Sequence, residues 1–395
     1  VVGSLEIVQQ IAHADSFGGY ASGFTAYREW IGHLRSAEHF AGLDVSMKAT
    51  SICVCDAAGT VIAAAEVPTD PAQIAQYLAP WRRTLRRVGH EAGALSPWLQ
   101  PALARLGLPA ICLETRHVRA AMAAQRNKTD ATDALALAQI VRTGWYRAVH
   151  VKSVESYRLR LLLIQRRNLK RKFLDIENSI RHSLKAFGIR LHLTGRQAFE
   201  GQVREMIGED PLLLAMLEPM LKVRAVMWEQ YLKLHKLLVQ LVGRDELCRR
   251  FMGIPGVGPV AALTFKTALD APGRFRRSKN VGAYFGLTAR RWQSGTSIDR
   301  QGHISKQGDN DVRRALYEAA SALLTRFQGW TALKAWGMKL AKTKGLKRAL
   351  VAVARKLAVI MHAMWKTGSE YRWTSSAGGG AWSQAKQRQL AARFA

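Results

Sequence analysis

The chain has 395 residues, 48% of them apolar, which is enough for two or three domains with buried cores. Lys and Arg number 59 against 29 Asp and Glu, so the net charge is +30. The sequence contains no uninterrupted apolar stretch long enough to span a membrane and no signal peptide, so we expect a soluble, intracellular protein.

The positive charge is spread over nearly the whole chain and recurs in runs between apolar helical segments. We interpret it as a surface for a polyanion, because each Lys or Arg placed on a phosphate releases condensed counterions. A solvated basic surface or a membrane-facing one are the alternatives. The cysteines show no zinc-type spacing and are expected to be buried thiols: Cys53, Cys55, Cys112 and Cys248.

The N-terminal part of the chain predicts an α/β domain over 41–150, preceded by an extension over 1–40 that shows little periodicity. Residues 40–56 alternate apolar and polar side chains, a turn follows at DAAGT, and VIAAAEV returns, which predicts a β-hairpin. The other expected elements are strands over 86–93 and 108–115 and helices over 96–107, 117–125 and 130–145.

Residues 151–250 predict a helical coiled-coil region, because apolar residues recur at helical spacing beside a basic face. Two long antiparallel helices are expected, connected between Gly188 and Gly201. A mostly helical C-terminal domain over 251–373 opens with a helix-hairpin-helix-like loop. The tail over 374–395 is rich in Ser, Gly, Ala and Gln, a composition typical of disorder.

Four acids of the α/β domain form a candidate metal site. Asp44 lies inside the first strand, where a charged side chain is costly unless it binds something. Glu91 ends a later strand, and Asp130 and Asp133 are three apart at the start of a helix, so both project from one face. Oxygen ligands suit Mg²⁺, and two ions can stabilise the attacking and leaving oxygens of phosphodiester chemistry.

Each acid also has an ordinary explanation. Asp130 could be an N-cap, Asp133 could interact with the helix dipole, and the others could be surface acids. In a chain this basic, an Asp in the centre of the first strand favours the metal site over this set of explanations.

The loop IPGVGPVAAL leads into a helix and is bracketed by glycines. Its backbone N–H groups and the positive end of the helix dipole could hold a nucleic-acid phosphate through Gly256, Val257 and Gly258. A plain tight turn between two helices is an equally good interpretation, and the residues alone leave both open.

Ser294 is the candidate nucleophile. It follows Arg290 and Arg291, whose guanidinium groups could stabilise charge that develops when a hydroxyl attacks a phosphodiester. The motif is weak, because Ser-Gly is common in loops, Ser297 and Ser305 are competitors, and His303 is only a distant candidate base. The basic residues expected to contact nucleic acid further along the chain are Lys306, Arg313 and Arg314.

These motifs occur in a fixed order. GLDVSMKATSICV surrounds Asp44, VGHEAG surrounds Glu91 and NKTDATDA contains Asp130 and Asp133, followed by IPGVGPVAAL, GLTARRWQSG, HISKQGD and RRALYEAA. The ordered combination resembles the DEDD transposases of bacterial insertion sequences, the IS-one-ten family, from about residue 41 to about residue 373.

The resemblance implies a ribonuclease-H or RuvC-like N-terminal domain whose metal ligands are Asp44, Glu91, Asp130 and Asp133, with Mg²⁺ as the cofactor. It implies a second transposase domain in which Ser294 forms a covalent phosphoserine link to DNA. The implied partners are donor and target DNA, an element-encoded guide RNA, and further copies of the chain in a dimer or tetramer joined by the middle helices. The implied location is the bacterial cytoplasm, in association with the nucleoid.

Two positions depart from the family pattern: His90 stands where an apolar residue is more usual, and Ala289 replaces a common Pro. The main hypothesis is an RNA-guided transposase that cuts and rejoins DNA through a serine intermediate. The alternatives are a RuvC-type junction-resolving nuclease without a covalent intermediate and a non-catalytic nucleic-acid-binding protein. Because about 160 residues separate Asp133 from Ser294, an active site shared between protomers is also considered.

Overall fold

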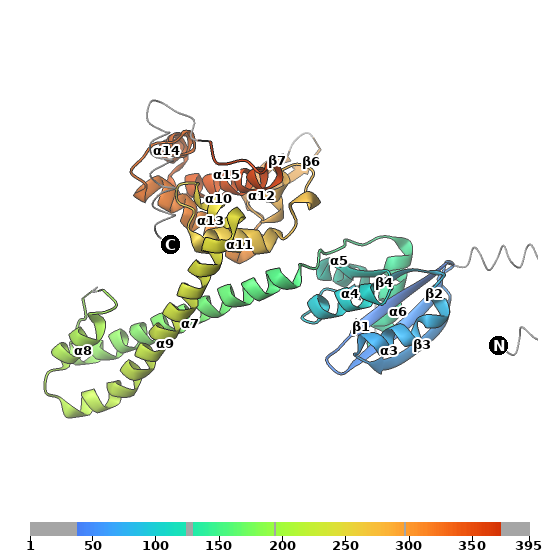
Figure 1. Ribbon diagram of the computed structural model, residues 1–395, viewed down its shortest axis with the longest axis horizontal. Helices are drawn as coiled ribbons and strands as arrows, with labels where there is room; N and C mark the ends of the chain where they lie inside the picture. The colour runs from blue at the N-terminus through green and yellow to red at the C-terminus, as the bar shows by residue number, and fades with distance from the viewer. Residues whose placement is uncertain (1–37, 124–128, 193–194, 296–297, 373–395) are drawn as a thin grey trace, which may run out of the picture. The chain divides into compact units, whose positions relative to one another are not determined.

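The computed structural model describes residues 38–123, 129–192, 195–295 and 298–372 (Figure 1). The predicted C-terminal tail and nearly all of the predicted N-terminal extension lie outside these ranges. The chain divides into two compact units at the Lys152–Ser153 junction, and each is described by itself. Within the described ranges, no helix is both long and apolar enough to cross a membrane.

The first unit is built on a five-stranded mixed sheet with the order β3-β2-β1-β4-β5. The first three strands are antiparallel neighbours, whereas β4 runs parallel to β1, and β5 runs parallel to β4. The strands are β1 (His39–Val45), β2 (Ala49–Asp56), β3 (Val61–Pro68), β4 (Leu85–Glu91) and β5 (Ala110–Leu113).

The prediction of one strand over 40–56 was wrong, because the chain turns back between β1 and β2. Ser46, Met47 and Lys48 are exposed, and the Ser46 hydroxyl donates to the Ala49 carbonyl oxygen at 2.7 Å, which closes the turn. The predicted hairpin is therefore the second half of a three-stranded meander.

Helices cover both faces of this sheet. On one face α3 (Pro71–Tyr77) and α4 (Ser96–Arg105) pack against Leu43, Ile52 and Val88. The helices on the other face are α5 (Thr115–Met122) and α6 (Asp130–Thr143).

All four cysteines are buried free thiols, as predicted. Cys53 and Cys55 both lie in the core beneath α6, as their alternation along one strand implies. Burial raises the pKa of Cys55 to about 11, so its thiol stays protonated and unreactive at neutral pH.

The second unit begins with two long helices, α7 (Val154–Leu184) and α9 (Pro211–Arg244), which are antiparallel as predicted (Figure 1). Arg166 in the first half of α7 donates to Tyr231 in the second half of α9, and Glu177 in the second half of α7 pairs with Arg224 in the first half of α9. Their connection is longer than expected, because a further helix, α8 (Phe199–Ile207), packs against both through Phe199 and Val203.

The rest of the second unit is a mostly helical domain with one large core, which confirms the predicted fold class of an α/β domain followed by helices. The turn at 253–258 joins two helices, as the helix-hairpin-helix-like prediction required. The elements are α10 (Glu246–Met252), α11 (Pro259–Leu269), α12 (Asn280–Tyr284), α13 (Asn310–Ser321), α14 (Ala332–Lys344) and α15 (Leu346–Thr367).

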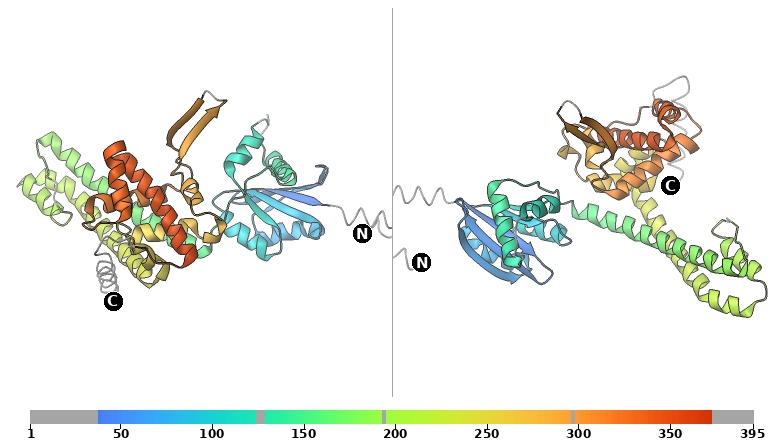
Figure 2. Two further views of the ribbon diagram at one scale, coloured as in Figure 1. Left: turned by 90° about the horizontal axis from the view of Figure 1, so that it is seen from above. Right: turned by 180° about the vertical axis from the view of Figure 1, so that it is seen from behind.

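A two-stranded hairpin that the sequence reasoning did not anticipate interrupts these helices. It consists of β6 (Ala289–Ser294) and β7 (Ile298–Ile304), and every residue of β6 is exposed. The two orange-brown strands project from the helical body in both views of Figure 2. This hairpin carries Ser294 at the end of its first strand.

Candidate active site

Asp44 and Glu91 lie at the ends of two adjacent parallel strands, β1 and β4. Leu43 pairs with His90 across this ladder, so the next residue of each strand is one of the two acids. The carboxyl ends of parallel strands meet at one edge of a sheet, which places these two acids beside each other in register.

Both acids face the α6 side of the sheet. A Cβ on Gly42 would lie 2.1 Å from the Ala134 carbonyl oxygen of α6, and one on Gly89 would lie 2.3 Å from Val141. Because side chains alternate along a strand, Asp44 and Glu91, each two residues further on, share that face.

The same end of this face holds the start of α6. Gln139 and Arg142, late in α6, donate to the carbonyls of Gly59 and Ala57, close to the beginning of β1. Since Ala134 lies over Gly42, α6 runs opposite to β1, and its first turn approaches the end of β1 where Asp44 lies.

Asp130 and Asp133 are the acids of that first turn. The N-cap is Thr129, whose hydroxyl accepts from the Thr132 amide at 3.2 Å, so the alternative of Asp130 as the N-cap is wrong. Asp133 is 9% exposed, whereas Asp130 is exposed. A carboxylate as buried as that of Asp133 is costly unless it is paired or binds a cation.

The structure thus brings Asp44, Glu91 and Asp133 to one end of one sheet face, with Asp130 at its rim. Within the described ranges, no group of three or more Asp, Glu, His or Cys side chains is arranged so that it could hold a metal ion between them. The set of carboxylate oxygens nevertheless has the chemistry that a hard divalent cation prefers.

His90 faces the opposite side of the sheet from the acids. It is buried, its Nε2 lies 3.3 Å from the Gln100 Oε1 atom, and burial lowers its pKa. A neutral imidazole fills a core position here, so the departure from the usual apolar residue leaves the acid site unchanged.

Ser294 is exposed at the end of β6, where its backbone pairs with Ile298. Arg291 does not share its face: the guanidinium forms a bidentate ion pair with Asp299, with both contacts at 2.7 Å. This ion pair lowers the pKa of Asp299. Arg290 donates to the Ser305 carbonyl oxygen at 3.2 Å, so both predicted arginines have partners within the hairpin region.

The residues that share the face of Ser294 are Trp292 and Arg300, which pair across the strands. The Trp292 indole lies over Gly302, where a Cβ would come within 2.4 Å of the ring, and it remains 53% exposed. His303 alternates with Gln301, on the Arg291 face. Trp292 and Arg300 were not predicted from the sequence. A predicted hairpin over these residues, with its alternating side chains, would have placed both on the face of Ser294. Ser297 lies outside the described residues.

The glycine loop before α11 allows this segment to pack closely against α13. Gly256 has φ +85°, and a Cβ there would lie 2.3 Å from the Ala319 carbonyl oxygen of α13. Val257 is buried in the core, and Gly258 is the N-cap of α11. Because no side chain caps α11, its first N–H groups stay available to a ligand.

The other predicted nucleic-acid contacts differ in their surroundings. Arg313 donates from Nη1 to the carbonyls of Gln307 at 2.7 Å and Gly308 at 3.1 Å, which ties its own loop together. Lys306 is exposed and has φ +55°. Arg314 is exposed and lines a groove against α7.

Comparisons with known proteins match two regions of this chain to transposases. A transposase family model for DEDD transposases matches residues 41–189, and the model of the transposase IS116/IS110/IS902 family matches residues 248–337. Together the two models cover more than half of the chain. The chain belongs to this IS110-type transposase family. The DEDD transposase domain accordingly begins in the first unit, and the protein is an insertion-sequence transposase that acts in DNA recombination.

Two curated transposases match this chain over three quarters or more of their own length. The transposase for insertion sequence element IS1111A of Coxiella burnetii is 28% identical over 84% of this chain and 90% of its own. The transposase for IS1328 of Yersinia enterocolitica is 25% identical over 65% of this chain and 75% of its own. A Thermus thermophilus RuvC structure aligns with 28% of this chain and 99% of its own, at 15% identity and a TM-score of 0.23.

Proposed function

We propose that this transposase cuts and rejoins DNA through a covalent intermediate on Ser294. In the step, the serine Oγ bonds to phosphorus, one bridging P–O bond of the DNA breaks, and the serine proton passes in net to the leaving DNA oxygen. One phosphodiester replaces another, so no external energy source is needed for rejoining. The exposed hydroxyl at the end of β6, with Arg300 on its face for the developing charge, supports this role.

We further propose that Asp44, Glu91, Asp130 and Asp133 hold Mg²⁺ for this reaction. DEDD and RuvC-like domains are typically dependent on divalent metals, and a bound ion would stabilise oxygen charge at the reacting phosphate. The four side chains offer only oxygen ligands, the kind that Mg²⁺ prefers, and the close packing of α6 on Gly42 supports the proposal by bringing the first turn of α6 near the end of β1. The convergence of these acids at one end of the α6 face is the observation that carries the proposed function.

The proposed partners are donor and target DNA together with a guide RNA encoded by the element, in the bacterial cytoplasm at the nucleoid. The net charge of +30 supports polyanionic partners. Predicted contacts that remain exposed and so suit this role include Lys306 and Arg314.

We propose that the transposase works as a homo-oligomer joined through α9. The outward side of α9 carries exposed apolar residues at spacings of four, seven and three: Leu212, Met216, Val223 and Val226. These spacings match a heptad seam, and a neighbouring stripe of α9 that contains Leu213, Leu217 and Leu221 packs on α7. Glutamate at Met216 and Val223 should shift the mass measured by light scattering to that of a monomer, and an unchanged mass would exclude this seam.

The experiment for the proposed function incubates Ser294→Ala and the control Ser305→Ala with labelled DNA, guide RNA and Mg²⁺. Protein–DNA adducts that survive denaturation should form with the control and be lost in Ser294→Ala. Adducts that persist in Ser294→Ala would assign the nucleophile elsewhere. Cleavage by both variants without any adduct would favour the RuvC-type nuclease.

A further inference from the structure

A basic groove of about 660 Å³ runs between α7, α11 and α13 of the second unit. Its α7 wall presents cations at helical spacing on one face, over roughly 16 Å of helix at 1.5 Å per residue. The lining cations are Arg160, Arg166, Arg167, Lys170, Arg171 and Arg314. The carboxylates that line it are Asp175, Asp311 and Glu318.

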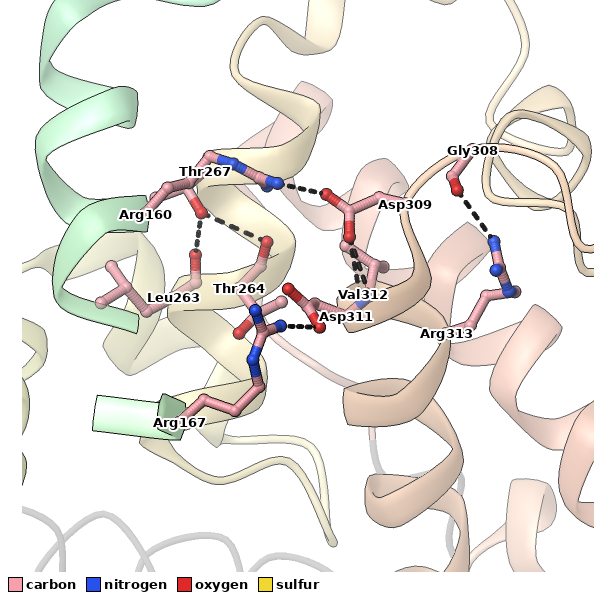
Figure 3. A network of polar contacts seen from close by, with 10 residues as sticks. All are labelled: Arg160, Arg167, Leu263, Thr264, Thr267, Gly308, Asp309, Asp311, Val312 and Arg313. Atoms are coloured by element: carbon pink, nitrogen blue, oxygen red, sulfur yellow. Dashed lines mark hydrogen bonds and ion pairs between the residues drawn. The ribbon is translucent and has the colours of Figure 1, made fainter. Parts of the chain in front are cut away.

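Part of this charge holds the groove together. Arg160 pairs with Asp309 at 2.6 Å, and Arg167 pairs with Asp311, which ties α7 to the first turn of α13 (Figure 3). Asp309 also caps α13 by accepting from the Asp311 and Val312 amides. Asp309 and Asp311 therefore help to fix the walls, whereas Asp175 and Glu318 are exposed carboxylates at the surface of the groove.

Arg166 is engaged with Tyr231 and His235 of α9, whereas the three other cations have no such role. Lys170, Arg171 and Arg314 are exposed and form no ion pair with any residue in the described ranges. The start of α11 enters the same groove at Val260, and this helix lacks a side-chain cap. Three uncommitted cations and an uncapped helix N-terminus thus converge on one concave surface, an arrangement that selects for anions.

We propose that this groove binds the sugar–phosphate backbone of a nucleic acid, with Lys170, Arg171 and Arg314 on the phosphates and the first amides of α11 beside them. The site rests on the proposed function for its context, because a transposase needs to hold nucleic acid away from the reacting phosphate. The ion pairs of Arg160 and Arg167 set the width of the groove and leave the other cations to the ligand. Binding is insensitive to base sequence, since backbone contacts carry no sequence information.

The test uses the full chain carrying Ser294→Ala, so that only binding is measured. Lys170, Arg171 and Arg314 are replaced together by Ala, and the charge-matched control replaces the exposed lysines Lys172, Lys236 and Lys342, which do not line the groove. A duplex DNA and a hairpin RNA of unrelated sequence are the two probes, each titrated by fluorescence anisotropy between about 50 and 200 mM salt.

The groove variant should lose at least about tenfold in affinity for one or both probes, and the slope of log affinity against log salt should fall by about two to three. A loss of affinity for DNA alone, for RNA alone or for both shows which nucleic acid the groove binds. Each of these results supports the site. Equal behaviour of the groove and control variants with both probes overturns it. Because adduct formation on Ser294 is not measured here, failure of the groove leaves the serine mechanism intact.

Discussion

The two halves of the proposed chemistry lie in very different structural settings. The acids are fixed at the end of a close-packed sheet, where a glycine lets α6 sit directly on β1. Ser294 lies on a fully exposed strand of a hairpin that projects from the helices. The arrangement of the acids therefore depends on core packing, whereas the surroundings of Ser294 depend on side-chain alternation across two strands of the hairpin.

Two glycines give the sharpest contrast. Gly42→Ala places a Cβ 2.1 Å from backbone of α6, whereas Gly302→Ala places one 2.4 Å from the movable Trp292 ring. We expect Gly42→Ala to lower the free energy of unfolding by about 3 kcal/mol or more and Gly302→Ala by less than about 0.5 kcal/mol. Chemical denaturation of both variants measures this, with Gly93→Ala, whose Cβ meets nothing within 4 Å, as the control. Equal losses in the two variants would contradict the contrast.

Neutralising an acid should affect activity without affecting the fold. Asp44→Asn keeps the shape of the side chain but removes its charge, so we expect strand cleavage to fall at least about a hundredfold. The melting temperature should stay within a few degrees of that of the parent chain. Cleavage assays with and without Mg²⁺ make the measurement, and Asp56→Asn, an acid at the far end of the neighbouring strand, is the matched control. Undiminished cleavage by Asp44→Asn would remove the acids from the mechanism.

On the hairpin, the two faces of the strands should behave differently. Arg300→Ala removes the guanidinium on the Ser294 face and should slow adduct formation about tenfold or more. Arg291→Ala breaks only an exposed ion pair on the other face, so its effect should be several-fold smaller. The measurement is the single-turnover rate of adduct formation for each variant. A slower rate for Arg291→Ala than for Arg300→Ala would show that the strand faces are wrongly assigned.

The smallest expected effect concerns His90. Burial lowers the pKa of its imidazole in the folded chain, so the unfolded chain binds more protons as pH falls below about 6.5. Its contribution to stability is present above that pH and is lost as pH falls toward the folded pKa. The variant His90→Leu should therefore show a flatter fall in unfolding free energy between pH 7 and pH 5. A slope in His90→Leu equal to that of the parent chain would contradict this account.

Much of the first unit was predictable, because buried strands and amphipathic helices leave periodic patterns in the sequence. The alternation that placed Cys53 and Cys55 on one face was correct, and the order of strands and helices followed from the same kind of pattern. The break at Ser46–Lys48 was missed because the apolar alternation continues through it, and the turn is held by hydrogen bonds between Ser46 and Ala49 rather than by a change in that pattern.

The serine region was less predictable for a physical reason. Every residue of β6 is exposed, so no apolar pattern marks the strand, and adjacency in sequence suggested Arg291 as the neighbour of Ser294. Alternation turns Arg291 away to Asp299 and brings Arg300 to the same face. The groove was equally hidden, since its walls come from helices far apart along the chain.

The role of Ser294 as the nucleophile can be tested by locating the covalent adduct on the protein. The transposase would be trapped with DNA and Mg²⁺, digested with a protease and a nuclease, and sequenced by mass spectrometry. Our account predicts a nucleotide remnant on Ser294 in the parent chain and a strong loss of that remnant in Asp44→Asn. A remnant on another residue, or cleaved DNA with no modified peptide, would contradict it.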